Sequence, residues 1–225
     1  FKIFIAKPRL GPIVGLVMTL FEAIEKIGGL SKPSKMPCHS WSIPAKNCKM
    51  GSKLAKLKTS VCNKCYAMRG FYPTPNVTNA LARRFEALLN PDWVSAMTLA
   101  ISGSEGSGFF RWFDSGDIQS LAHLKQIAQI ANNLPGIQFW LPTKEYKIVS
   151  DFTKENELPE NLTIRISGYM IDGPAPVALS KKIGVLTSTV SKTSWTCPAG
   201  NQGNKCLSCR ACWDKTVPNV AYKYH

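Results

Sequence analysis

The fold is decided by the apolar stretch Phe109-Phe-Arg-Trp-Phe113, which is followed at once by Asp114-Ser-Gly-Asp117. The aromatic run predicts a strand, and the polar run with its glycine predicts the turn that ends it. Ser120 then predicts the N-cap of a helix, because apolar residues recur at helical spacing from Leu121 to Ala131. Pro135-Gly136 ends this helix, and the chain enters a second apolar stretch.

The same alternation continues along the chain. Further strands are predicted at 137–141, 162–166 and 183–189, and further helices at 76–90, 92–101 and about 145–153. Strands that alternate with helices form a mostly parallel sheet with right-handed crossovers. We therefore predict an α/β fold with a mostly parallel sheet.

Polar side chains follow four of these strands in succession. They are Asp114, Ser115 and Asp117, then Thr143, Lys144 and Glu145, then Ser167, and finally Ser188 and Thr189. The carboxyl ends of parallel strands meet at one edge of a sheet, where α/β proteins bind their ligands. The sequence thus predicts a shared pocket at this edge.

Length and composition predict one globular domain. The chain has 225 residues, of which 44% are hydrophobic, and we expect a single α/β domain over 35–225, with cysteine-rich ends at 35–70 and 191–225. Residues 1–34 are expected to form an N-terminal arm or helix. The apolar segment 11–24 is interrupted by acidic residues and is too short to cross a bilayer, so we expect a buried or amphipathic helix and no membrane span.

Positive charge is concentrated where the cysteines are. The net charge is +14, and residues 1–70 carry thirteen Lys and Arg against Glu22 and Glu25. Such a field attracts nucleic acid or another polyanion, although it also suits an anionic thiolate cluster or a merely solvated surface. The residues expected to contact phosphates are Lys53, Lys56, Lys58 and Arg69.

The eight cysteines are the strongest chemical signal. They form an N-terminal group and a C-terminal group, namely Cys38, Cys48, Cys62 and Cys65, and Cys197, Cys206, Cys209 and Cys212. Three cysteines spaced as C-x2-C-x2-C, together with a Cys-Pro pair, are typical of ferredoxin-like 4Fe-4S sites. Paired C-x2-C knuckles are typical of zinc, which remains the alternative. Disulfides are less favoured, because no secretory signal is visible and an α/β core needs no such staples. The grouping leaves one or two clusters possible, and Cys38 or Cys48 could belong to either group.

Several motifs resemble the gene-product-eighty-eight family of tailed bacteriophages. They are Pro37-Cys38, Ser42-Ile-Pro-Ala45, Gly51-Ser-Lys-Leu-Ala-Lys56, Cys62-x2-Cys-Tyr-Ala67, Asn79-Ala-Leu-Ala-Arg-Arg84, Arg111-Trp112, Asp114-Ser-Gly-Asp117, Leu141-Pro-Thr143, Glu145-Tyr-Lys147, Pro174-Ala-Pro176 and Cys206-x2-Cys-Arg-Ala-Cys-Trp213. The resemblance covers roughly residues 35–225. It implies a phage protein that acts in the cytoplasm of the bacterial host.

A more distant likeness is to the radical S-adenosylmethionine enzymes. It implies a partial (β/α) barrel in which Cys48, Cys62 and Cys65 hold a 4Fe-4S cluster with one iron open to the cofactor, and in which the C-terminal cysteines hold an auxiliary cluster. By the same likeness, the cofactor-binding residues are Asp114, Ser115, Gly116, Asp117 and Ser167. The chain departs from that family in its Cys48-x13-Cys62-x2-Cys65 spacing and in having Asp117 where a glutamate is usual. A fourth ligand from Cys38 would close the iron that the cofactor needs.

Two functions follow as hypotheses. The first is an iron–sulfur enzyme of the radical type that modifies a nucleotide, a nucleic acid or a protein during infection. The second is a non-catalytic iron–sulfur or zinc protein that binds nucleic acid or a host protein. They differ in whether a cluster has an open iron.

Overall fold

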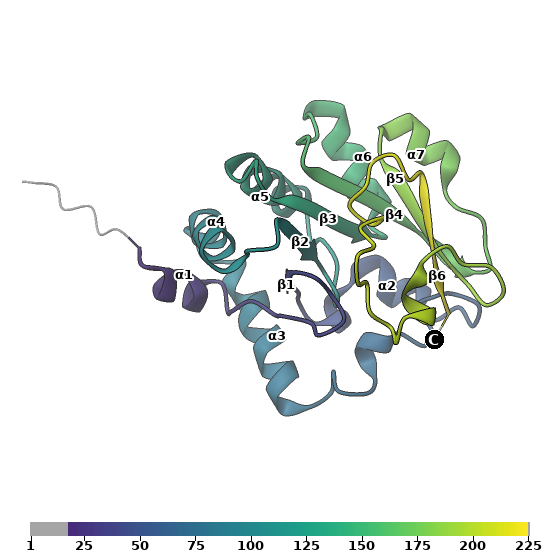
Figure 1. Cartoon of the computed structure of the whole chain (residues 1–225), viewed down its shortest axis with the longest axis horizontal. Coiled ribbons are helices and arrows are strands. Elements are labelled where there is room, and N and C mark those ends of the chain that lie inside the picture. Colours follow the sequence, from purple (N-terminus) through teal and green to yellow (C-terminus); the bar gives the residue numbers. More distant parts are fainter. Residues whose placement is uncertain (1–17, 225) are drawn as a thin grey trace, which may run out of the picture.

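The computed structural model describes residues 18–224 and contains one six-stranded sheet (Figure 1). All strands are parallel and lie in the order β1-β2-β3-β4-β5-β6, which is also their order along the chain. The strands are β1 (His39–Trp41), β2 (Phe109–Trp112), β3 (Gln138–Thr143), β4 (Leu162–Ile171), β5 (Leu186–Ser191) and β6 (Asn219–Lys223). Each strand thus pairs with the strand next in sequence, as in a (β/α) barrel, while β1 and β6 form the two edges of an open sheet. The predicted α/β class, with its barrel-like parallel sheet, is confirmed.

Helices connect the strands, and those between residues 93 and 183 cover the outer face of the sheet. The α-helices are α1 (Leu20–Lys26), α2 (Lys49–Leu54), α3 (Pro75–Ala87), α4 (Trp93–Ser104), α5 (Leu121–Asn133), α6 (Tyr146–Glu155) and α7 (Val177–Ile183), and the 3-10 helices are η1 (Ala45–Asn47), η2 (Tyr66–Met68) and η3 (Pro198–Asn201). Ser120 is the N-cap of α5 as predicted, because its side chain accepts a hydrogen bond from the backbone N–H of His123.

The main hydrophobic core lies between the sheet and the outer helices. Phe110 and Trp112 of β2 point into it, as do Ile164 and Ile166 of β4, and all four are buried. Trp93 of α4 packs there with the strand aromatics. Because side chains alternate along a strand, Arg111 and Arg165 must project from the opposite, inner face. The sequence therefore sends two cations into the concave side of the sheet.

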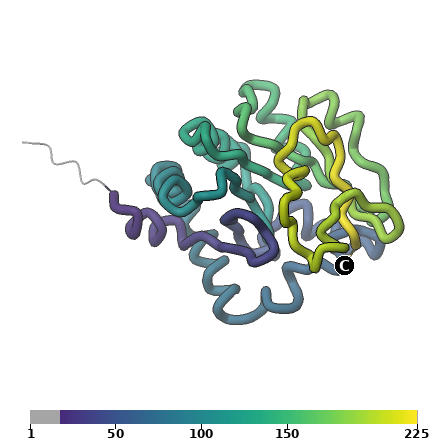
Figure 2. Tube along the Cα trace, in the orientation of Figure 1, coloured from purple at the N-terminus to yellow at the C-terminus, as the bar shows by residue number. Residues whose placement is uncertain are grey.

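The carboxyl-terminal segment covers this inner face, and it crosses in front of the sheet as the yellow-green trace in Figures 1 and 2. Trp213 packs edge-on against Trp140 of β3 and donates its indole N–H to the carbonyl of Phe110 at 2.9 Å. Arg165 is fully buried beneath the segment. Its guanidinium donates five hydrogen bonds to the carbonyls of Thr187, Ala211, Cys212, Asp214 and Val217, at 2.8–3.1 Å.

The strand predictions hold in position, with two corrections. Residues 183–185 are not strand, because α7 runs to Ile183 and Gly184 ends it in the left-handed conformation with φ of 66°. The helix predicted over 92–101 also runs three residues further, to Ser104. The two edge strands, β1 and β6, were not predicted.

Helix α1 packs against α4. Ala23 within this helix and Ile27, the residue at its C-cap, are buried in the core. Thr19 and Glu22 form a reciprocal capping box at its start. The part of the predicted apolar helix before residue 18 lies outside the described residues. Among residues 18–224, no helix is long and apolar enough to span a membrane.

Candidate metal and cofactor site

Three cysteines converge at the carboxyl edge of the sheet. A Cβ placed on Gly51 of α2 would lie 3.6 Å from the Sγ of Cys48 and 3.8 Å from that of Cys62, so the two sulfurs approach the same glycine. Cys65 is close enough to both for its charge to raise their pKa values. The three thiols, which we call the three-thiol site, come from separate turns of residues 48–65.

Cys48 is positioned by its place at the start of a helix. It is the N-cap of α2, and the next turn of that helix is tied to the sheet because Glu145 accepts a hydrogen bond from the N–H of Met50 at 2.6 Å. Glu145 is buried and directly follows β3 through Lys144. Gly51 is required here, because a Cβ on it would lie 2.8 Å from the Cβ of Cys48.

Cys62 and Cys65 are positioned by two further contacts with the sheet. The loop before Cys62 pairs with the extended end of β4, since the N–H of Val61 donates to the carbonyl of Tyr169 and that of Ile171 to the carbonyl of Thr59. Cys65 caps η2, whose Tyr66 donates its hydroxyl to the carbonyl of Asp114. Strand β4 therefore extends beyond its predicted end to hold this loop.

Burial makes ionisation of these thiols costly. Desolvation raises the pKa of Cys48 and of Cys62, and the neighbouring sulfurs raise each pKa further because two like charges would lie side by side. Lys144 opposes both shifts. A bound cation would offset the same cost, which is why metal sites collect thiolates that repel one another when no metal is bound.

Asp117 lies beside the three-thiol site in a buried hydrogen-bonded position. Its carboxylate accepts hydrogen bonds from the Thr143 hydroxyl at 2.6 Å and from the N–H groups of Ile118 and Lys144 at 2.8 and 2.9 Å. Desolvation raises its pKa to about 6 despite these three donors. A carboxylate has about four acceptor positions, so one remains for a ligand.

Asp117 should make stability pH-dependent. Its folded pKa lies above the unfolded value near 4, so the native state takes up a proton more readily than the unfolded chain does. Its contribution is therefore favourable below about pH 4 and is lost as the pH rises to about 6, by about 2–3 kcal/mol. The Asp117→Asn variant cannot ionise at this position. Its free energy of unfolding relative to that of the native protein should therefore increase as the pH rises from about 4 to about 6. Urea unfolding of both proteins at several pH values checks this, and a constant difference would contradict it.

The other predicted cofactor residues occupy the same edge but differ in what they contact. Asp114 accepts a hydrogen bond from the Tyr72 hydroxyl at 3.2 Å, and Ser167 shares one with Ser188 at 3.0 Å. Ser115 is buried, and its hydroxyl has no partner among the described residues. Gly116 has φ of 84°, and a Cβ on it would lie 2.3 Å from the Ile43 side chain, so its role is close packing.

The remaining five cysteines form a second group, which we call the five-thiol group. Cys38 lies with Cys212 in one buried cluster, and the charge of Cys206 raises the pKa of Cys38. Cys197 likewise affects Cys206 and Cys212, and Cys209 affects Cys197. Of the groupings that the sequence left open, the structure therefore has the one in which Cys38 lies with the C-terminal cysteines. Cys38 crosses over because the backbone N–H of Cys206 bonds to the carbonyl of Lys35, which brings the C-terminal turns against residues 35–38.

Arg111 lies between the two groups. Its guanidinium stacks over the ring of Trp140 at 4.7 Å, and its charge lowers the pKa values of Cys38, Cys206 and Cys212 in the five-thiol group. The same charge reaches Tyr66, the neighbour of Cys65. The Arg111 Nε is buried without a hydrogen-bond partner among the described residues. This cation favours negative charge on both sides of it.

All eight thiols are free, so no disulfide joins them. Within residues 18–224, no three His, Cys, Asp or Glu side chains lie close enough together to hold a single metal ion. A cubane cluster differs from a single ion, because each thiolate binds a different corner of the cage and the sulfurs lie farther apart. Two thiol-rich sets beside the half-buried cations Lys144 and Arg111 fit such a group in donor chemistry and in charge.

Comparison with protein families matches residues 20–215 to the family described as Gene product 88. The chain belongs to the Gene product 88 family. The search of curated proteins and the search of solved structures returned no match. The family expected from the sequence motifs is thereby confirmed, and the match begins in α1 rather than at residue 35. It includes all eight cysteines, so both thiol groups lie within the family region.

The predicted phosphate-contacting residues are exposed on the same segment as the three-thiol site. Lys53 lies in α2, Lys56 and Lys58 follow it, and Arg69 ends η2.

Three residues near the three-thiol site had no predicted role or only a predicted position at a strand end, namely Lys144, Glu145 and Tyr169. Only the placement of Lys144 and Glu145 directly after a strand could have signalled them. Tyr169 carries no such signal, since it acts through an unpredicted extension of β4.

Proposed function

We propose that this protein is an iron–sulfur enzyme in which Cys48, Cys62 and Cys65 hold a 4Fe-4S cluster with one iron free of protein ligands. The observation that carries this proposal is the place of Cys38. Three thiols share the carboxyl edge of the sheet, and the fourth N-terminal cysteine lies in the five-thiol group. With only three cysteine ligands, the fourth iron is available to S-adenosylmethionine.

The surroundings of the three-thiol site support cofactor binding. When bound, a reduced cluster with an open iron supplies the electron for cleaving S-adenosylmethionine. Asp117 has a free acceptor position for the cofactor's amino group, and Lys144 provides positive charge for its carboxylate. The Ser167 and Ser188 hydroxyls, which share a hydrogen bond between the paired strands β4 and β5, suit a ribose. Ligands of α/β proteins bind at this edge of the sheet.

The five-thiol group would hold a second, closed 4Fe-4S cluster. Four thiolates satisfy a cubane, so one of its five cysteines is spare. Cys38 is the candidate for the spare thiol, because the other four already have the C-x2-C-x2-C run and the upstream Cys-Pro pair. As a phage-family protein, the enzyme would act in the cytoplasm of the infected bacterium.

Anaerobic purification tests the proposal directly. We expect iron and acid-labile sulfide in equal amounts, at about four to eight of each per chain. Adding S-adenosylmethionine to the reduced protein should change the electron paramagnetic resonance spectrum of the open cluster. Adenosine, which lacks the amino and carboxylate groups that would bind the open iron, serves as the control. Zinc without sulfide, or a spectrum that ignores the cofactor, would refute an open iron–sulfur site.

The exposed cations favour a second candidate function. Lys53, Lys56, Lys58 and Arg69 surround the three-thiol segment, as expected for a metal module that binds nucleic acid or a host protein without catalysis. Finding only zinc, together with strong salt-dependent binding to nucleic acid, would favour this alternative.

A further inference from the structure

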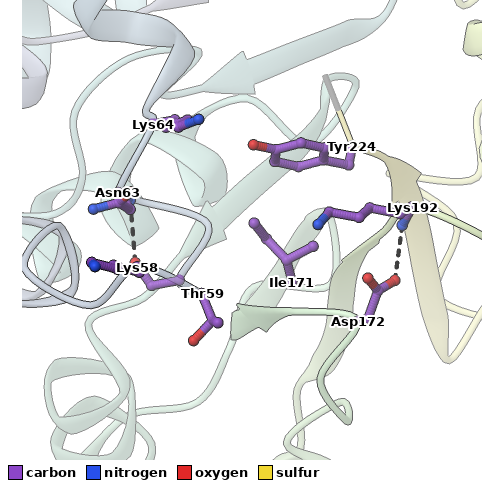
Figure 3. A pocket seen from close by; sticks show the side chains of 9 residues that line it. Lys58, Thr59, Asn63, Lys64, Ile171, Asp172, Lys192 and Tyr224 are labelled. Carbon is purple, nitrogen blue, oxygen red and sulfur yellow. Dashed lines mark hydrogen bonds between the residues drawn. The ribbon is translucent and has the colours of Figure 1, made fainter.

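A hollow of about 330 Å³ is lined in part by Asn63 and Lys64, from the same loop as the three-thiol site (Figure 3). It is formed where the loop of Lys58 and Lys64 faces Ile171 at the end of β4, Lys192 after β5 and Tyr224 after β6. Segments distant in sequence therefore line one site. Its volume is within the range of small-ligand pockets.

The hollow is cationic. Lys58, Lys64 and Lys192 are exposed, and none has a carboxylate within ion-pair distance in the part of the chain that the structure describes. Asp172 is the acidic residue of the lining, and its carboxylate is already engaged by the Ser191 hydroxyl at 2.6 Å and the N–H of Lys192 at 2.8 Å. Three lysines in the lining of one hollow favour an anion with more than one charge.

An aromatic ring stands at the same hollow. Tyr224 is held by its backbone N–H, which donates to the carbonyl of Ser191 at 2.8 Å, and the Lys192 ammonium lies 5.5 Å from the ring centre. Figure 3 shows its hydroxyl directed toward the loop of Asn63 and Lys64. Together with Ile171, the ring gives an apolar surface among cations, which is the combination that binds a base and its phosphate.

We propose that this hollow binds one nucleotide unit of a single-stranded nucleic acid. The three lysines contact the phosphates, and the ring of Tyr224 stacks on the base. A strand is favoured over a free nucleotide because Lys53, Lys56 and Arg69, outside the hollow, are exposed on the same segment of the chain as Lys58 and Lys64. The proposal deepens the proposed function by naming its substrate class, and to that extent it rests on it.

The hollow is also placed to present a strand to the three-thiol site. Asn63 and Lys64, which line it, are the two residues between Cys62 and Cys65. The same loop therefore carries two of the proposed cluster ligands and part of the nucleotide site. A neighbouring nucleotide of the bound strand would pass the carboxyl edge of the sheet.

Fluorescence anisotropy of the anaerobically purified full chain tests this, with labelled oligo-dT and oligo-U of about 12 nucleotides as probes. The variant K58A/K64A/K192A should bind at least about 10-fold more weakly, and the slope of log K against log salt should fall by about 2. The control K125A/K181A/K182A removes the same charge from exposed lysines elsewhere and should change binding by less than about 3-fold. Equal losses in the two triple variants would overturn the proposal.

Tyr224 supplies an independent test that keeps all the lysines. Tyr224→Ala should weaken binding about 10-fold, whereas Tyr224→Phe retains the stacking ring and should bind normally. Unchanged binding by the alanine variant, tighter binding to a duplex, or equal competition by free dTMP would each refute a single-strand site. Iron and sulfide are measured on the same samples. Binding of the probes by protein that lacks iron would support the nucleotide site and contradict the proposed enzyme. Iron in protein that does not bind the probes would support the cluster and contradict the nucleotide site.

Discussion

Replacing Arg165 by methionine is expected to lower the free energy of unfolding by about 3–5 kcal/mol and to release the cysteine-rich segment from the inner face of the sheet. Arg165 is fully buried and donates to five carbonyls, four of which belong to residues 211–217. Methionine fills similar space without donors, so these acceptors lose both Arg165 and water. Urea unfolding measures the loss, and limited proteolysis locates it.

The matched control is Arg83→Met. Arg83 is exposed on α3, so the same chemical change there should alter stability by less than about 0.5 kcal/mol. In Arg165→Met, early cleavage should fall within the carboxyl-terminal segment. Equal stability of the two variants, or no new cleavage there, would mean that the segment is held by Trp213 and the thiols rather than by the guanidinium.

Much of the sheet could be predicted because its strands are locally distinct. Residues 109–113, 137–141 and 162–166 combine apolar content with flanking turns, which marks a buried strand in any context. The edge strands lack this signal. β1 has three residues, and β6 follows closely spaced cysteines and reads as part of their turns. Both form through pairing with a neighbour already in the sheet, which is information that their own residues do not carry.

The grouping of the cysteines likewise depends on tertiary contacts that cannot be predicted from the local sequence. Spacing along the chain assigns Cys38 to the N-terminal group, only ten residues before Cys48. Its partners are instead set by a tertiary contact, in which the turn of Cys206 pairs with Lys35. Arg165, the residue that brings the C-terminal segment there, reads in sequence as one cation within an apolar strand. Residue type thus singles out the eight thiols, whereas their grouping could not be predicted from spacing.

Because of this grouping, replacing different cysteines should have different effects on iron content and on the spectral response to S-adenosylmethionine. Cys48→Ala should lose the spectral response to S-adenosylmethionine and about half of the iron, because it removes one of only three thiolates from the proposed open cluster. Cys38→Ala should keep both the response and nearly all of the iron, because four thiols remain in the five-thiol group. Iron analysis and electron paramagnetic resonance of the two variants, purified side by side, measure the contrast.

Cys38→Ala is the decisive member of the pair. Cys38 is buried, so its loss leaves a small cavity, and unfolding measurements must show that any loss of iron is not a loss of fold. If the folded variant lost its response to the cofactor, Cys38 would be a ligand of the first cluster and the division of three and five thiols would fail. If it retained the response while Cys48→Ala, Cys62→Ala and Cys65→Ala all lost theirs, only the three-thiol site would meet the cofactor. An iron open to S-adenosylmethionine would then follow from the path of the chain at Lys35, which takes Cys38 away from the carboxyl edge of the sheet.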